Sequence, residues 1–211
     1  MTTTSTPLTF TNPPDDREEL ARAEVYGLLA ALLYASPDAE LYAQLQVAPT
    51  EAPAAGGFLE ASWMGVVAAS RRLGLEQVAD EYAALFQGVG KPEIFLYGSY
   101  HVAGHLNEKP LVELRDTLAA LGLERASHVE ETEDHIASLC EVMRYLIAGD
   151  DLAVSNLAKQ QAFFNDHVRH WVDSMLNAIA EHPRADFYRA LALFARDFFA
   201  VEGQGFDLLE A

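Results

Sequence analysis

The chain has 211 residues, of which 50% are hydrophobic, and its 32 acidic and 14 basic side chains give a formal net charge of -18. Such an acidic surface repels nucleic-acid phosphates and anionic lipid headgroups, so it argues against nucleic-acid binding and favours basic partners. The single cysteine, Cys140, excludes an intrachain disulfide and a multi-cysteine metal site.

The start of the chain shows no targeting signal. Residues 1–14 form a Thr- and Pro-rich tail that has neither the basic start nor the apolar stretch of a secretory signal. The longest apolar run, from Val25 to Ala35, is too short for a membrane span. We therefore expect a cytoplasmic protein without stable membrane insertion, in which residues 15–211 form one helical domain.

Turn and cap residues divide the first part of the chain into helices. Asp15 or Asp16 can cap a first helix that ends before Pro37, and Asp38 can cap a short second one. Residues 47–57 are rich in Ala, Pro and Gly and predict a surface loop. The apolar residues at helical spacing, which we expect to be buried, are Leu20, Tyr26, Leu29, Leu32, Leu33, Leu41 and Leu45.

Two further helices are predicted before an irregular aromatic segment. One runs from about Phe58 to Gly74, and the next begins at Leu75. Residues 92–100 are rich in aromatic side chains and lack a helical period, although a short helix can start at Ser99. The core positions expected in the two helices are Trp63, Val66, Val67, Leu73, Val78, Tyr82, Leu85 and Phe86.

The second half of the chain continues the helical pattern. Pro110 suits the first turn of a helix that ends at Gly122, a long helix from Leu157 ends before Pro183, and a last helix ends at Gly203. Expected core positions are Leu111, Leu114, Leu118, Leu121, Leu157, Phe164, Val168, Trp171, Met175, Ile179, Phe187, Leu191, Phe194, Phe198 and Val201. No alternating strand pattern appears, so we predict an all-α, single-domain bundle of about eight to ten helices.

The most polar stretch, residues 129–136, precedes the most regular helix. Thr132 can act as the N-cap of that helix, which places Glu133 and Asp134 in a first turn where the dipole favours negative charge. Substituting Asp134 or His135 in such a turn should cost about 0.3–1 kcal/mol. The apolar face of the helix carries Ile136, Leu139, Cys140, Met143, Leu146 and Ile147, and Gly149 follows as its stop.

Metal-ligand patterns of helical bundles are absent from this sequence. None of the 7 histidines follows a glutamate by three residues, as di-iron bundles require, and there is no His-Glu-x-x-His. His101 with His105, and His167 with His170, have spacings that could form one edge of a site, but such pairs are commoner as surface residues. We therefore predict no metal and no other cofactor.

Asp134 and His135 have two interpretations. They could be an acid/base or polar contact pair, or a capped helix start with a solvated histidine. Adjacent helical residues point about 100° apart, so Asp134 is not expected to orient His135, and no serine or cysteine can be assigned as a nucleophile beside them. The aromatic residues at 95–100 are equally open to two interpretations, a loop packed on the core or a binding surface.

Four sequence features resemble those of one known family in order and spacing. Residues 130–135 (EETEDH) are similar to a Glu-Pro-x-Asp-His signature, residues 81–86 (EYAALF) to Glu-Tyr-x-x-Leu-Phe, and residues 97–100 (YGSY) to Tyr-x-Ser-x-Tyr. The fourth feature consists of Phe164, His167, Trp171 and Phe187-Tyr188. Over about residues 26–202, the chain thus resembles the TorD/DmsD family of redox-enzyme maturation chaperones, which is related to the NarJ nitrate reductase chaperones.

The resemblance implies a cytoplasmic all-helical chaperone and not an enzyme. Its partners would be the twin-arginine signal peptide and the apoprotein of a molybdenum-cofactor oxidoreductase, which it protects until cofactor insertion and export. The resemblance also implies a hinge near residues 122–133 and a monomer or a homodimer formed by lobe exchange. The implied peptide-binding residues are Phe86, Phe95, Tyr97, Ser99, Tyr100, Glu131, Asp134 and His135.

The sequence departs from the family pattern at two places. Thr132 stands where the family usually has proline, and Phe95-Leu96 stand where a proline often precedes the tyrosine. An acidic bundle with aromatic loops nevertheless complements a peptide with a cationic head and an apolar stretch. Two other classes stay open: a helical metal-dependent or hydrolytic enzyme that uses Asp134 and His135, and a structural helical dimerisation module.

Overall fold

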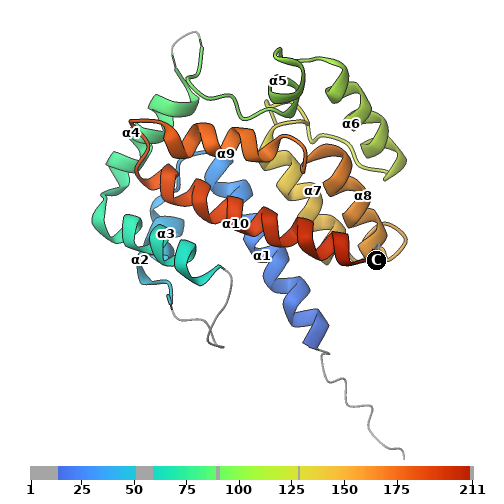
Figure 1. Ribbon diagram of the computed structural model, residues 1–211, viewed down its shortest axis with the longest axis horizontal. Helices are drawn as coiled ribbons and strands as arrows, with labels where there is room; N and C mark the ends of the chain where they lie inside the picture. Colours follow the sequence, from blue (N-terminus) through green and yellow to red (C-terminus); the bar gives the residue numbers. More distant parts are fainter. Residues whose placement is uncertain (1–13, 51–58, 89–90, 128, 210–211) are drawn as a thin grey trace, which may run out of the picture.

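Ten helices and no strand make up the regular structure of the residues that the computed structural model describes, 14–50, 59–88, 91–127 and 129–209 (Figure 1). The predicted tail up to residue 13 and most of the predicted loop, residues 51–57, lie outside the described residues. The all-α prediction is confirmed. The helices are α1 (Pro14–Tyr34), α2 (Ala39–Val47), α3 (Glu60–Arg72), α4 (Leu75–Phe86), α5 (Gly98–Ala103), α6 (Lys109–Ala120), α7 (Ile136–Ala148), α8 (Leu157–His167), α9 (Val172–Glu181) and α10 (Phe187–Leu208).

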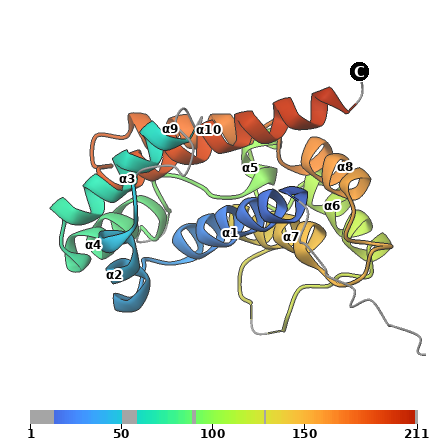
Figure 2. The ribbon, with the colours of Figure 1, turned by 90° about the horizontal axis from the view of Figure 1, so that it is seen from below.

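Helices α1 and α10 connect the two ends of the bundle. Helix α1 packs along α7, while α10 packs on α3 and α9 and also contacts α4 and α8. Figure 1 shows α2, α3 and α4 at one end and α5 to α8 at the other, and Figure 2 shows α9 and α10 on one side with α1 and α7 on the other. The core lies between these helices and includes the fully buried rings of Tyr26, Phe163 and Tyr188.

Several helix ends form for the reasons that the sequence predicts. The carboxylate of Asp38 accepts the N–H of Leu41 at 2.8 Å and so caps α2. Pro110 lies in the first turn of α6, where its missing N–H is not needed. Gly122 follows α6 with a φ of 71°, a left-handed conformation that glycine adopts without strain. Cap and stop residues therefore placed these boundaries correctly.

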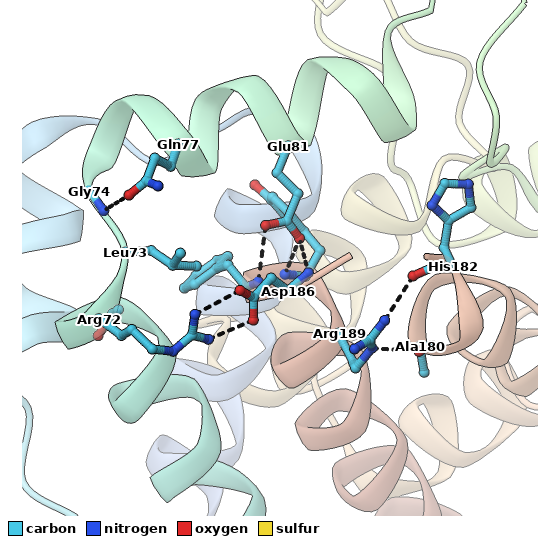
Figure 3. A network of polar contacts seen from close by, with 12 residues as sticks. Arg72, Leu73, Gly74, Gln77, Glu81, Ala180, His182, Asp186 and Arg189 are labelled. Atoms are coloured by element: carbon cyan, nitrogen blue, oxygen red, sulfur yellow. Dashed lines mark hydrogen bonds and ion pairs between the residues drawn. The ribbon is translucent and has the colours of Figure 1, made fainter. Parts of the chain in front are cut away.

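Glu81, on α4, caps the start of α10 from a neighbouring helix (Figure 3). Its Oε1 accepts the N–H groups of Asp186 and Tyr188, both at 2.8 Å, and its Oε2 accepts that of Phe187 at 3.0 Å. A helix start has unpaired N–H groups and a positive dipole end, and a carboxylate satisfies both. Arg72 of α3 adds an exposed ion pair with Asp186, so three helices meet at this junction.

The long helix predicted from Leu157 to Pro183 is wrong, because the chain breaks it into α8 and α9 around residues 168–171. In a continuous helix, the N–H of Trp171 would bond to the carbonyl of His167. Here the indole Nε1 of Trp171 donates to that carbonyl at 2.6 Å, while its backbone N–H bonds to Val168. A side chain thus replaces the helical bond, and the buried positions on both sides keep a helical spacing.

The predicted end of the last helix at Gly203 is also wrong. Helix α10 continues to Leu208 because Phe206, 2% exposed, packs on Phe164 with ring centroids 5.3 Å apart. Three residues that we expected in the core are exposed: Leu20, Leu157 and Val201. Leu157 and Val201 line a groove of 430 Å³ that also includes residues of α1, and Leu20 lies in the first half of α1.

Candidate functional site

Two segments that are far apart in the sequence lie side by side at the predicted site. The chain before α5 and the chain before α7 form an antiparallel bridge between Tyr97 and His135. The N–H of Gly98 donates to the carbonyl of Asp134 at 2.9 Å, and the N–H of Ile136 donates to that of Leu96 at 2.8 Å. The YGSY and EETEDH segments are therefore one structural unit.

Asp134 is a buried acceptor in this unit and is only 3% exposed. Its Oδ2 accepts the N–H of Ser99 at 2.8 Å, and its Oδ1 accepts the hydroxyl of Thr132 at 2.6 Å. The prediction that Thr132 caps α7 is wrong, because α7 begins at Ile136 and Glu133 and Asp134 precede it. The carboxylate of Asp134 therefore joins two segments, where we had expected it to sit in an exposed first turn.

His135 is the N-cap of α7 and is only 4% exposed. Its Nδ1 accepts the N–H of Ala137 at 3.2 Å, which requires an unprotonated nitrogen at that position. Its ring meets the rings of Tyr97 and Tyr34 edge-on, with centroids 5.0 and 6.3 Å away. The interpretation of His135 as a solvated histidine is therefore wrong, and its ring bonds to the backbone of Ala137 and not to Asp134.

Burial lowers the pKa of His135 to about 4, although Glu131 and Asp134 oppose this shift. In the unfolded chain a histidine has a pKa of about 6.5, so below that pH only the unfolded state binds the proton. The free energy of unfolding should therefore fall by about 2 kcal/mol between about pH 7.5 and about pH 5 because of this residue. Denaturant unfolding at both pH values measures the loss.

The matched variants for this pH test are His135→Asn and His105→Asn. Asparagine can cap a helix without titrating, so His135→Asn should remove the part of the pH dependence that His135 contributes. His105 is exposed, so its replacement should leave the dependence unchanged. A His135→Asn protein that loses as much stability as the wild type would show that His135 takes up its proton in the folded state.

The aromatic loop, residues 95–100, is partly exposed and packs on Trp171. Phe95 and Tyr100 stack with centroids 4.1 Å apart, and His101 stacks on Trp171 at 5.6 Å. The Nε2 of His101 lies 2.8 Å from the carbonyl of Phe95. A Cβ at Gly98 would come within 3.1 Å of the indole of Trp171, so glycine allows this close approach. The loop is thus both packed and available at its outer rings.

Of the other predicted site residues, Glu131 belongs to this unit and Phe86 packs against the core. The hydroxyl of Tyr97 donates to the carboxylate of Glu131, and burial together with Glu131 raises the pKa of Tyr97. Phe86 packs on Tyr82 and Tyr188, with both centroids 5.1 Å away. Phe86 is half-buried, and its ring contacts are to these two core tyrosines and not to the Tyr97–His135 unit.

A groove of 390 Å³ lies beside this unit, between α1, α7 and the connection that precedes α7. Its apolar walls include Ala30, Ala31, Leu118, Leu123, Val129, Ala137 and Val142. Its charged lining residues are Glu124, Arg125, Glu133 and Glu141. Tyr34, whose ring also contacts His135, lies on the lining too. This groove was not predicted, since most of its lining residues lie outside the motifs of the sequence.

The side chains that could bind a metal ion do not gather at one place in the described residues. In the described residues, no group of three His, Cys, Asp or Glu side chains is placed to hold a metal ion. His105 lies outside α5, which ends at Ala103, and so it does not share a helix with His101.

The thiol of Cys140 is buried on α7, and burial raises its pKa, which keeps it protonated. None of the described helices is long and apolar enough to cross a membrane.

Comparison with known proteins gives consistent results. A family model described as the nitrate reductase delta subunit matches residues 40–177. The chain is 25% identical over 140 residues to the chaperone protein TorD of Vibrio cholerae. The aligned region covers 63% of this chain and 64% of that protein, so the chain spans less than two thirds of the length of that relative. It is 26% identical over 188 residues to the chaperone protein TorD of Aliivibrio fischeri, which covers 81% of this chain and 87% of that one.

A solved structure shares the fold. It is the crystal structure of a candidate redox enzyme maturation protein from Archaeoglobus fulgidus, with a TM-score of 0.53 at 17% identity, over 93% of this chain and 98% of that chain. The family model covers well over half of the chain and includes the segments 81–86, 97–100 and 130–135. The family resemblance that the sequence motifs predicted is therefore confirmed. The protein belongs to the nitrate reductase delta subunit family.

Proposed function

We propose that this protein is a cytoplasmic chaperone for a molybdenum-cofactor oxidoreductase. It binds the twin-arginine signal peptide and the apo form of that enzyme, and it protects them until cofactor insertion and export. The observation that carries the proposal is the apolar groove with carboxylates on its lining, which lies beside the Asp134–His135 unit. A twin-arginine peptide has a cationic head and an apolar stretch behind it, and the groove offers a complement to each.

The groove suits the apolar stretch of the peptide. Each methylene group that it removes from water contributes about 0.8 kcal/mol, so a few side chains of the peptide suffice for a specific contact. The carboxylates of Glu133 and Glu141 are already paired with arginines of this chain. Glu133 lies 2.8 Å from Arg115 and 3.7 Å from Arg125, and Glu141 lies 2.9 Å from Arg144. A peptide arginine would therefore exchange with these exposed guanidinium groups, and the net charge of -18 favours its arrival.

The predicted peptide-binding residues then divide into two roles. The half-buried rings of Phe95, Tyr97 and Tyr100 present surface that a peptide can cover. The buried Asp134 and His135 hold the aromatic loop and α7 in register through their backbone contacts. In this proposal, the outer rings contact the peptide, and one task of the buried pair is to keep those rings in place.

The proposal is tested by the binding kinetics of a peptide with two consecutive arginines followed by an apolar stretch. Salt should slow association, because the attraction between exposed charges is screened beyond about 8 Å at physiological ionic strength. Ala31→Glu puts a charge on the exposed wall of the groove and should weaken binding by at least about tenfold, mainly through faster dissociation.

Ala162→Glu is the matched control for this test. It adds the same charge on the exposed surface of α8 and should leave the dissociation rate unchanged. A wild-type protein that does not bind the peptide would refute the proposed function. Binding that is equally strong in both variants would place the peptide outside the groove.

A further inference from the structure

Asp134 also lines a second, smaller cavity of 60 Å³ that is separate from the groove. This cavity lies where α5, α6 and the break between α8 and α9 meet. Apart from Ser99 and Asp134, none of its polar residues was predicted to bind a peptide. The polar residues on its lining are Ser99, Glu113, Asp134, Asp166, His167 and His170. Its remaining walls are apolar and include the indole of Trp171.

Ser99 is the unusual member of this lining. Its side chain is fully buried, and its hydroxyl has no hydrogen-bond partner within the described residues. Its backbone N–H is already bound to Asp134. A buried hydroxyl without a partner is costly, about as much as a lost hydrogen bond, and native proteins keep few of them. The hydroxyl of Ser99 is therefore available to a ligand that enters the cavity.

The electrostatics of the cavity favour a cation. Three carboxylates, Glu113, Asp134 and Asp166, line it. Glu113 is paired with Lys109 at 3.1 Å, but both side chains of that pair are largely exposed, so a ligand can displace the lysine. His167 adds no positive charge near neutral pH, since burial lowers its pKa, and its Nε2 lies 2.9 Å from the hydroxyl of Thr117.

The arrangement suits a planar, delocalised cation better than a metal ion. No three metal-binding side chains converge in the part of the chain that the structure describes, so the acceptors are too widely spread for one small ion. A guanidinium has one carbon and three nitrogens with five N–H donors in a fixed plane, and it can reach spread acceptors. The cavity has room for about four waters, which matches a group of this size.

We infer that this cavity is an arginine subsite, in which Ser99 and the carboxylates of Asp134 and Asp166 receive the guanidinium of one peptide arginine. The inference rests on the proposed function and names where one of the two arginines binds. Glu133 lines the apolar groove while the next residue, Asp134, lines this cavity. Two adjacent residues thus line the two sites: the groove that suits the apolar stretch of the peptide and the cavity that suits its cationic head.

The test combines Ser99→Ala with a peptide in which lysine replaces both arginines. Because the hydroxyl has no partner in the described protein, Ser99→Ala should unfold at the wild-type temperature or above it. It should nevertheless bind the arginine peptide about tenfold more weakly. Replacing arginine with lysine should cost the wild type about tenfold and the Ser99→Ala protein much less, since the shared contact is already lost.

A second pair of variants keeps the test decisive if Ser99→Ala disturbs the loop. Asp166→Asn removes an exposed carboxylate from the cavity, while Asp173→Asn removes one from the exposed first turn of α9. Calorimetric titration should show weaker binding of the arginine peptide by Asp166→Asn only. If the wild type binds the peptide and these substitutions leave its preference for arginine over lysine unchanged, the subsite is refuted while the proposed function stands.

Discussion

Replacing Glu81 with alanine should lower the free energy of unfolding by about 3–5 kcal/mol, the largest single effect that we expect in this protein. The carboxylate accepts three backbone N–H groups at the start of α10. Alanine leaves these donors without their acceptor in a region where Glu81 is only 9% exposed. For a chain of this size, the loss corresponds to a melting temperature roughly 10 °C lower.

Thermal and denaturant unfolding of Glu81→Ala and Gln77→Ala measure this effect. Gln77 lies on the same helix and caps it through one exposed bond to the N–H of Gly74, so its loss should cost no more than about 1 kcal/mol. Equal stability of the two variants would mean that the start of α10 finds its acceptors elsewhere. Residues 81–86 form one of the segments that resemble the family, so the expected loss would assign Glu81 in that segment a role in the fold.

Replacing Asp134 with alanine should cost about 3 kcal/mol, well above the 0.3–1 kcal/mol expected for an exposed helical turn. The carboxylate accepts the N–H of Ser99 and the hydroxyl of Thr132, and the alanine variant leaves the buried N–H unpaired. The bridge between the aromatic loop and α7 should loosen with it. Asp134→Ala should therefore lose both stability and peptide binding, and the loss of binding alone cannot assign Asp134 to the peptide.

Asp134→Asn separates these two effects. The amide oxygen can still accept from Ser99, and the amide N–H₂ can donate to the hydroxyl of Thr132, so the loss of stability should be about 1 kcal/mol. Any larger fall in the affinity for an arginine peptide then measures the missing charge. Unfolding in urea at constant pH provides the stability comparison. An Asp134→Ala protein as stable as the asparagine variant would contradict the buried role of the carboxylate.

Much of the fold could be predicted from local patterns, because apolar spacing and cap residues act within one helix. Asp38, Pro110 and Gly122 each mark a boundary through a backbone need that the sequence displays. The break at residues 168–171 could not be predicted this way, since the indole of Trp171 takes over a helical carbonyl without disturbing the apolar spacing. The continuation of α10 past Gly203 likewise depends on Phe164, a distant residue.

The site was predictable in part for a related reason. The resemblance named the YGSY and EETEDH segments, and the structure joins them through Tyr97 and His135. The burial of Asp134 could not be foreseen, because it depends on an N–H contributed by Ser99, 35 positions away. The groove and the small cavity are lined by residues from several helices, and most of these residues are of types that are common in any helix. Shape that arises between helices leaves no local pattern in a sequence.

The long-range pairing of α1 and α10 has a consequence for biosynthesis. Arg22 and Glu202, which are joined by two bonds of 2.6 and 2.8 Å, are separated by 180 positions, and Glu81 waits for partners 105 to 107 positions later. At about 5–20 residues per second, a ribosome needs several seconds to deliver α10 after α4 has emerged. During that interval the face of α4 that packs on α10 is uncovered, and so is the part of α1 around Arg22, which leaves the nascent chain open to aggregation until α10 has emerged.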